Sequence, residues 1–337
     1  MSAKKGNTQR TGRSMTPQAP KKPSVAPKKT TIPPRSRGHT DLLPPPMPKP
    51  AVAFLGLGAM GRPMAGRLLD LGFPLRVWNR TATTAKTLTG ASVGASPGDC
   101  VQGAAVIVTM LADADALAAV LDGPDGILAA IAKEKRALRP VIVDMATIGR
   151  RAAIALGKRI EASGARFVDA PVSGSVRPAA RGELVALVGG AVRSVERARP
   201  VLDALCKKVI HAGPIGQGQA LKVVLNGVGA HHFVAFASML ALGEKAGLAR
   251  DILLDAFTTG AFATPSYVGK RDKLLARDFT SEFSLALALK DAALNVQLQH
   301  ECSLKLPVVR AIIADLESAV SEGLGDLDLF AIEKHYR

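Results

Sequence analysis

The feature that most restricts the fold of this chain is a short apolar run followed at once by closely spaced glycines. Ala51–Leu55 is apolar throughout, as in a buried parallel strand, and Gly56–Gly61 reads Gly-Leu-Gly-Ala-Met-Gly. The pattern after it predicts a helix over Pro63–Leu71 and a second strand over Leu75–Asn79. Because a GxGxxG turn between a strand and a helix is typical of a βαβ unit, the sequence predicts an α/β fold that begins near residue 51.

Each glycine of this turn has a task in such a unit. Gly56 permits the tight turn, Gly58 lets the backbone approach a pyrophosphate, and Gly61 allows the helix to pack closely on the strand. The helix N-terminus supplies a positive end for the phosphates. A plain glycine turn is the alternative, but the flanking strand and helix favour dinucleotide binding by Gly56, Leu57, Gly58, Ala59, Met60 and Gly61.

The end of the second predicted strand bears on the choice of dinucleotide. NAD-binding domains usually place an acidic residue there to accept hydrogen bonds from the ribose hydroxyls. This chain has Asn79, Arg80 and Thr81 instead, and a guanidinium is suited to binding a phosphate. The sequence therefore favours NADPH (NADP+) over NADH, with a solvated surface arginine as the alternative interpretation of Arg80.

Further apolar runs alternate with helical segments and predict a doubly wound parallel sheet, a Rossmann domain over residues 51–212. Met110, Leu111 and Thr147 directly follow predicted strands, so we expect them to line the cofactor site. The predicted strands are Ala105–Met110, Val141–Asp144, Arg166–Val172, Leu184–Val188 and Lys208–His211.

The chain changes character after residue 212, and residues 213–337 are predicted to form an all-α domain. The stretch Val223–Leu242 is apolar enough to be a buried helix, and its polar residues argue against a membrane span. Lys222 and Asn226 are four residues apart, so they share one helix face. A lysine among Leu and Val either extends to water or has a task inside the protein. The predicted helices are Gln217–Ala246, Arg250–Thr258, Tyr267–Ala276, Ser284–Glu301 and Leu306–Glu322.

The first fifty residues carry most of the net positive charge of the chain. They hold eleven Lys and Arg against Asp41 alone, a net charge of +10 out of +16, together with 11 of the 22 prolines. A segment this polar and proline-rich cannot offset its chain entropy by burial, so we expect a disordered basic tail. A solubilising extension, an organelle transit peptide and a nucleic-acid-binding arm all remain open for residues 1–50.

The cysteines and histidines argue against a disulfide scaffold and against a metal site. Cys100, Cys206 and Cys302 lie far apart with no CxxC pair, which suits a reducing compartment such as the cytoplasm. No group of His, Cys and Asp has the spacing of metal ligands, so we expect no metal.

Several motifs in the same order resemble the β-hydroxyacid dehydrogenase family. They are the Gly56–Gly61 turn, Asp169-Ala-Pro-Val-Ser-Gly-Ser175, the glycines Gly213, Gly216 and Gly218 followed by Lys222 and Asn226, and Lys290-Asp291. The resemblance covers residues 51 to about 332 and is strongest to the glyoxylate/succinic semialdehyde reductase branch. It implies a fold like that of 6-phosphogluconate dehydrogenase, with an active site between the two domains.

The resemblance also implies roles for individual residues. Lys222 matches the catalytic lysine, and Asn226 matches the residue that orients the substrate. On the substrate side, Ser173 and Gly174 match the loop that holds the substrate carboxylate, with Ser175 beside it. The remaining matches are Thr147 and Lys290 as cofactor contacts, and Phe283 and Asp291 near the active site. The usual Ser-Thr pair of the family reads Ala146-Thr147 here, so one hydroxyl of the expected contacts is missing.

The residues and the resemblance together predict an NADPH-dependent reductase of short aldehyde acids such as glyoxylate and succinic semialdehyde. Lys222 would give the proton, since an ordinary lysine is protonated near pH 7. The alternatives are a 3-hydroxyisobutyrate or tartronate semialdehyde enzyme, an imine reductase, and a nucleic-acid-associated protein that uses the basic tail. Lys222 argues against the last two. We expect a homodimer or homotetramer built on the helical domain, without a membrane partner.

Overall fold

The computed structural model describes residues 48–134 and 139–337, and Pro48–Arg337 forms one compact unit. The prediction of a disordered tail over residues 1–50 therefore falls outside the described residues, apart from Pro48–Pro50. Within that short piece, the ammonium of Lys49 donates to the carbonyl of Leu71 and lies 5.3 Å from the centre of the Phe73 ring.

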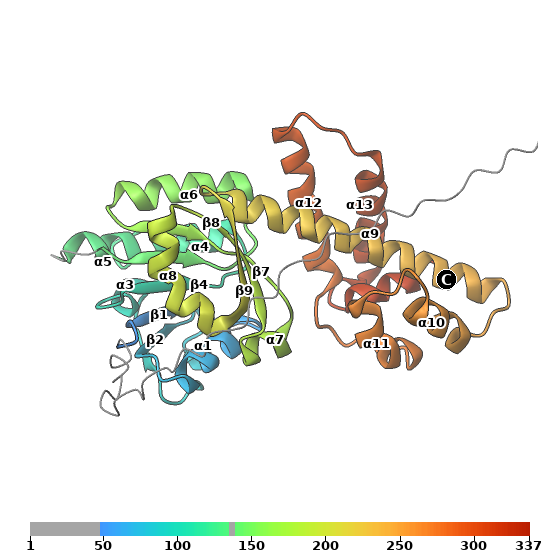
Figure 1. Ribbon diagram of the computed structural model, residues 1–337, viewed down its shortest axis with the longest axis horizontal. Coiled ribbons are helices and arrows are strands. Elements are labelled where there is room, and N and C mark those ends of the chain that lie inside the picture. The colour runs from blue at the N-terminus through green and yellow to red at the C-terminus, as the bar shows by residue number, and fades with distance from the viewer. Residues whose placement is uncertain (1–47, 135–138) are drawn as a thin grey trace, which may run out of the picture. The chain divides into compact units, whose positions relative to one another are not determined.

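A mostly parallel sheet forms the first half of the described chain and confirms the predicted Rossmann fold (Figure 1). The strand order is β3-β2-β1-β4-β5-β6-β8-β7, and β9 pairs with β8. The order reverses between β1 and β4, which is the place where sheets of this type bind ligands. The strands are β1 (Val52–Leu55), β2 (Leu75–Trp78), β3 (Ser92–Val93), β4 (Val106–Thr109), β5 (Val141–Asp144), β6 (Arg166–Asp169), β7 (Val172–Ser173), β8 (Leu184–Gly189) and β9 (Cys206–Gly213).

The prediction of one parallel strand over Arg166–Val172 is wrong. After β6 the chain changes its partner strand and continues as β7, which pairs antiparallel with β8 through Val172 and Ala186. Pro171 lies between the two strands and has no N–H to donate, so only its carbonyl joins the sheet, where it accepts from the N–H of Leu187 at 2.9 Å. The break places Ser173 at the outer end of the sheet rather than inside it.

Helices cover both faces of this sheet, which explains why its central strands are apolar without alternation. Successive residues of β1 point to opposite faces, and Ala53 and Phe54 are both fully buried. Val52 and Phe54 pack with α1 (Gly61–Asp70), α7 (Val176–Arg181) and α8 (Val192–Leu205). Ala53 and Leu55 pack on the other side with α3 (Pro97–Cys100), α4 (Ala114–Leu121), α5 (Ile127–Lys133) and α6 (Arg150–Ala162). The short α2 (Ala82–Lys86) follows β2.

The second half of the chain is helical and has a core of its own. The long α9 (Gln217–Lys245) contacts β8 and β9 near its start and α10, α12 and η2 farther along (Figure 1). Four aromatic rings, those of Phe233, Phe236, Tyr267 and Phe330, pack edge-on or tilted in this core. The other elements are α10 (Arg250–Thr259), α11 (Pro265–Leu275), α12 (Leu285–Glu301), α13 (Pro307–Ala319), the short turns η1 (Val320–Leu324) and η2 (Leu329–Lys334).

The prediction that Val223–Leu242 is a buried helix is only partly correct. One side of α9 packs on the sheet and on the helical core, but apolar side chains on the rest of the helix are exposed: Val224, Leu225, Val228, Met239 and Leu242. By length and composition alone, α9 is the one helix of the described chain that could cross a membrane. Part of the apolar surface of α9 is therefore left exposed by the rest of the described chain.

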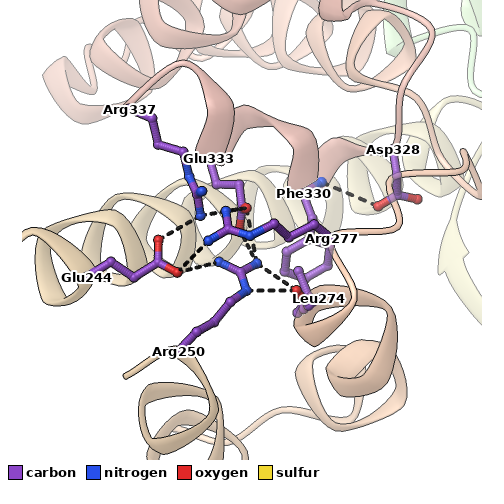
Figure 2. A network of polar contacts seen from close by, with 8 residues as sticks. All are labelled: Glu244, Arg250, Leu274, Arg277, Asp328, Phe330, Glu333 and Arg337. Atoms are coloured by element: carbon purple, nitrogen blue, oxygen red, sulfur yellow. Dashed lines mark hydrogen bonds and ion pairs between the residues drawn. The ribbon is translucent and has the colours of Figure 1, made fainter. Parts of the chain in front are cut away.

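A network of arginines and glutamates joins the elements of the helical domain (Figure 2). Arg250, the first residue of α10, contacts Glu333 at 2.8 Å and Glu244 at 2.9 Å, and its Nε donates to the carbonyl of Leu274. The side chain of Glu333 is only 2% exposed, and burial raises its pKa while Arg250 opposes the rise. Arg277 and Arg337 also contact both glutamates. The network therefore fixes η2 against α9 and α10.

A buried carboxyl group lies at the end of β5. Asp144 is fully buried, and its Oδ1 accepts a hydrogen bond of 2.8 Å from the hydroxyl of Thr109 on β4. Its Oδ2 has no hydrogen-bond partner within the described residues. Burial raises the pKa of Asp144 to about 7, the Thr109 hydroxyl opposes this, and the negative charge of Asp169 adds to it.

Removing Arg250 should destabilise the protein strongly because it leaves the buried carboxylate of Glu333 with weaker partners. We expect Arg250→Met to lower the free energy of unfolding by about 2–4 kcal/mol, below the full cost of breaking a buried pair because Arg277 and Arg337 remain. The control is Arg199→Met, which removes the exposed Arg199–Asp203 pair and should cost about 0–1 kcal/mol. Equal losses in urea unfolding would contradict the structural role of the network.

The stability difference between the unmutated protein and Asp144→Asn should depend on pH. The folded pKa of about 7 lies above the usual 3.8, so the folded state binds this proton more tightly than the unfolded chain. The contribution of protonated Asp144 to the free energy of unfolding is complete below about pH 4. It is lost as the pH rises toward 7, by roughly 1.4 kcal/mol per pH unit. Urea unfolding of both proteins from pH 4.5 to 8 measures this difference. A difference that does not change with pH would show that Asp144 titrates normally.

Candidate active site

The glycine turn between β1 and α1 has the geometry of a dinucleotide-binding loop. Gly56 has a φ of +98°, and a Cβ on it would overlap the carbonyl oxygen of Met110. A Cβ on Gly61 would overlap the carbonyl oxygen of Gly56. Gly58 differs, because a Cβ there would meet nothing within 4 Å. The turn is thus closed toward the protein at Gly56 and Gly61 and open toward solvent at Gly58.

An open hollow lies against this turn. Its volume is about 610 Å³, and it is bordered by the loop, by one face of α1 and by the residue that follows Ser175. α1 begins at Gly61, and the positive end of its helix dipole favours negative charge there. A pyrophosphate placed over Gly58 would use this combination of open space and helix dipole. The lining residues are Leu57, Gly58, Ala59, Arg62, Pro63, Gly66, Leu88 and Val176.

The side chains of Asn79 and Arg80, which follow β2, have different surroundings in the structure. Asn79 uses its side chain inside the protein, since its Oδ1 accepts from the N–H of Leu57 at 2.9 Å and its Nδ2 donates to the carbonyl of Thr81 at 3.1 Å. Asn79 therefore holds the glycine loop against the end of β2. Arg80 is exposed and forms no ion pair among the described residues, so its guanidinium is available to an anion.

Residues from both halves of the chain meet at the segment after β5. Lys290, on α12, donates its ammonium to the carbonyl of Thr147 at 3.0 Å and more weakly to that of Ala112 at 3.4 Å. Leu294, one turn farther along α12, packs against the Cα of Gly149. The structure thus brings together Thr147 and Lys290, two residues that the sequence assigned to the cofactor.

Lys222 and Asn226 lie on one face of α9, and Asp291 of α12 connects them to Lys290. The Nδ2 of Asn226 donates to Asp291 Oδ2 at 2.6 Å, and Asp291 Oδ1 lies 3.3 Å from the ammonium of Lys290. Lys222 is half-buried, and burial lowers its pKa, while Asp291 opposes the shift and Lys290 adds to it. A lysine whose pKa is lowered in this way gives up its proton more readily than an exposed one.

Within the described residues, no hydrogen bond joins the remaining predicted residues to this group. Ser173 ends β7 and Ser175 precedes α7, and within the described chain neither hydroxyl has a hydrogen-bond partner. Gly174 between them has a φ of +133° and packs against Leu184. Phe283 packs against the helical core, where its N–H reaches Asp328. Their roles toward a substrate remain predictions.

Sequence reasoning missed two residues that organise the site, Gln219 and Asp169. Asp169, at the end of β6, accepts from the N–H groups of Gly216 and Gln219 at 2.7 and 2.8 Å and so begins α9. Burial raises the pKa of Asp169, and these N–H groups oppose the rise. Gln219 lies three residues before Lys222 and seven before Asn226, and this spacing on one helix face could have revealed it.

Comparisons with known proteins agree with this geometry. Residues 51–213 match the family model described as the NAD-binding domain of 6-phosphogluconate dehydrogenase, and residues 216–336 match that of NADP-dependent 3-hydroxyisobutyrate dehydrogenase. Glyoxylate/succinic semialdehyde reductase 1 of Arabidopsis thaliana is 35% identical over 83% of this chain and 96% of its own length. An NAD-dependent L-serine dehydrogenase of Pseudomonas aeruginosa is 31% identical over 84% of this chain and 96% of its own length.

A solved structure extends the likeness to three dimensions. The 3-hydroxyisobutyrate dehydrogenase of Mycobacterium tuberculosis, determined with L-serine, superposes with a TM-score of 0.75 at 31% identity and covers 86% of this chain and 99% of its own. The two family models together span both halves of the described chain, and the curated relatives are oxidoreductases. The chain therefore belongs to the β-hydroxyacid dehydrogenase family of NAD(P)-binding oxidoreductases, the family of 3-hydroxyisobutyrate dehydrogenase.

Proposed function

We propose that this protein is an NADPH-dependent reductase that converts short aldehyde acids, such as glyoxylate and succinic semialdehyde, into hydroxy acids. The observation that carries the proposal is the half-buried Lys222, which shares a face of α9 with Asn226, lies near the charge of Asp291 and follows by one turn Gln219, the residue that contacts the segment around Thr147. The similarity to glyoxylate/succinic semialdehyde reductases of Arabidopsis thaliana supports the choice of substrate. The retained Lys222 favours aldehyde reduction over the imine reductase alternative.

The residues of the chain supply placement and a proton. The dinucleotide, held over Gly56–Gly61, supplies the hydride when bound. The ammonium of Lys222 donates a proton to the oxygen of the aldehyde and stabilises the negative charge that develops there. Asn226, fixed by its 2.6 Å hydrogen bond to Asp291, orients the same oxygen. The free hydroxyls of Ser173 and Ser175 are donors for the carboxylate of the substrate.

Initial rates on a panel of substrates test this function directly. The panel is glyoxylate, succinic semialdehyde, tartronate semialdehyde and methylmalonate semialdehyde, each with NADPH and with NADH. We expect the highest kcat/KM for one of the first two with NADPH. A clear preference for either of the others would move the protein to another branch of the family, and no turnover of any aldehyde would refute the proposal.

Replacing Lys222 should abolish most of the activity without loss of cofactor binding. We expect Lys222→Ala to lower kcat by roughly 10²–10⁴-fold, the usual contribution of a positioned general acid. Lys222→Arg should not restore it, because a guanidinium is bulkier and a poor proton donor. The control is Lys245→Ala, at the exposed end of the same helix, which should keep full activity. The proton donor lies elsewhere if Lys222→Ala retains much of the kcat.

Arg80 should determine the preference for NADPH. Arg80→Asp removes the partner of the 2′-phosphate and adds a like charge, so NADPH affinity should fall by about one to two decades, or roughly 1.5–3 kcal/mol. The control Arg151→Asp makes the same change at an exposed position of α6 and should leave affinity unchanged. Titration of both cofactors by fluorescence measures the effect. Binding of NADH by the unmutated protein at least as tightly as NADPH would contradict the interpretation of Asn79–Thr81.

We also propose that the chain acts as a homodimer or homotetramer through its helical domain. The support is the row of exposed apolar residues on α9, including Val224 and Val228, both about half exposed. Burial of this row in a second copy would remove it from water. Light scattering on the purified protein gives the mass, and a monomer would refute the proposal.

A further inference from the structure

The side chain of Gln219 forms a bridge between α9 and the segment Ala146–Gly149. Its Oε1 accepts hydrogen bonds from the N–H groups of Ile148 and Gly149 at 3.0 and 3.1 Å, and its Nε2 donates to the carbonyl of Ala146 at 2.7 Å. The residue is 0% exposed, so water does not compete for these contacts. An amide is suited to this position, because it presents an acceptor and a donor on one planar group.

Gln219 is itself fixed from the sheet side. Its own N–H donates to Asp169 Oδ2, and the N–H of Gly216 donates to Asp169 Oδ1. Asp169 ends β6, and the bridged segment follows β5, which pairs with β6 directly. The two groups that Gln219 joins, Asp169 and the segment Ala146–Gly149, are therefore attached to neighbouring strands, and this limits their movement relative to each other.

The bridge lies between the predicted cofactor contact Thr147 and the proposed proton donor Lys222. Thr147 is in the middle of the bridged segment, and Lys222 lies one turn after Gln219 on α9. Lys290 holds the carbonyl of Thr147 from α12, but no other side chain in the described chain joins this segment to α9 by a hydrogen bond. Gln219 is thus the direct link between Thr147 and α9, beside the indirect one through Asn226, Asp291 and Lys290.

We propose that Gln219 is a positioning residue for the reaction, which sets the spacing between the cofactor contact at Thr147 and the ammonium of Lys222. This inference rests on the proposed function, in which Lys222 gives the proton, and on the prediction that Thr147 is a cofactor contact. A displacement of about 1 Å between reacting groups can cost roughly a hundredfold in rate. Loss of the bridge should therefore lower kcat much more than it lowers binding.

The first test compares two identical substitutions in the first turn of α9. Gln219→Met keeps the size of the side chain and removes all three hydrogen bonds, and we expect kcat to fall about 10- to 100-fold. The KM for the aldehyde and the dissociation constant of NADPH should change by less than about threefold, since the glycine loop and Arg80 are intact. The control is Gln217→Met, because the amide of Gln217 makes no hydrogen bond within Pro48–Arg337. It should change none of these quantities.

A second variant separates positioning from general loss of structure. A protonated Glu at position 219 offers the same acceptor and donor as the amide, whereas an ionised Glu cannot donate to Ala146 and adds a charge next to Asp169. The kcat of Gln219→Glu relative to the unmutated protein should approach one at low pH and fall as the pH rises. A ratio that stays constant while circular dichroism shows folded protein would overturn the proposal.

Amide hydrogen exchange gives a measurement that does not depend on activity. In cofactor-free Gln219→Met, exchange at Ile148 and Gly149 should increase, while in Gln217→Met it should not. Faster exchange with an unchanged kcat would show that the bridge is structural only, and the proposal would be wrong. If the unmutated protein reduces none of the aldehydes, the proposed function fails separately, and unchanged exchange in Gln219→Met would then also refute the bridge.

Discussion

The carboxylate of Asp169 is the contact on which the rest of the site depends. It accepts hydrogen bonds from the N–H groups of Gly216 and Gln219 where α9 begins. A negative charge at the end of β6 therefore lies against the positive end of the α9 dipole. The direction of α9 follows from this contact, and with it the positions of Lys222 and Asn226. Both oxygens of Asp169 are used in this way, so the carboxylate organises the backbone and is not free to act on a substrate.

The sequence is informative where one residue type has one physical reason to be present. The glycine turn predicts its own conformation, because Gly56 and Gly61 have no room for a side chain and Gly58 leaves space for a ligand. The helices of the second half are also predicted to within a few residues, since apolar spacing and proline or glycine ends define them. Lys222 and Asn226 could be placed on one face from their spacing alone.

The sequence is less informative where a residue acts through partners far along the chain. Asn79 carries an ordinary side chain after a strand, and only the fold shows that it holds the N–H of Leu57. The helical spacing could place Gln219 on the face of Lys222, but its hydrogen-bond partners lie 70 and 71 positions away, and no local pattern records them. The break at Pro171 and the exposed apolar side of α9 have the same origin. Both depend on which other segment is available to pair or pack, and local periodicity does not contain that information.

The start of α9 also bears on how the protein unfolds. The sheet is connected to α9 by the contacts among Asp169, Gln219 and the segment Ala146–Gly149. Farther along, α9 continues into the helical core, where it contacts α10, α12 and η2. The helical half cannot lose α9 without exposing the buried contacts at the ends of β5 and β6, and the sheet cannot open there without releasing the helix. We therefore expect the two halves of Pro48–Arg337 to unfold in one cooperative transition, although each has a hydrophobic core of its own.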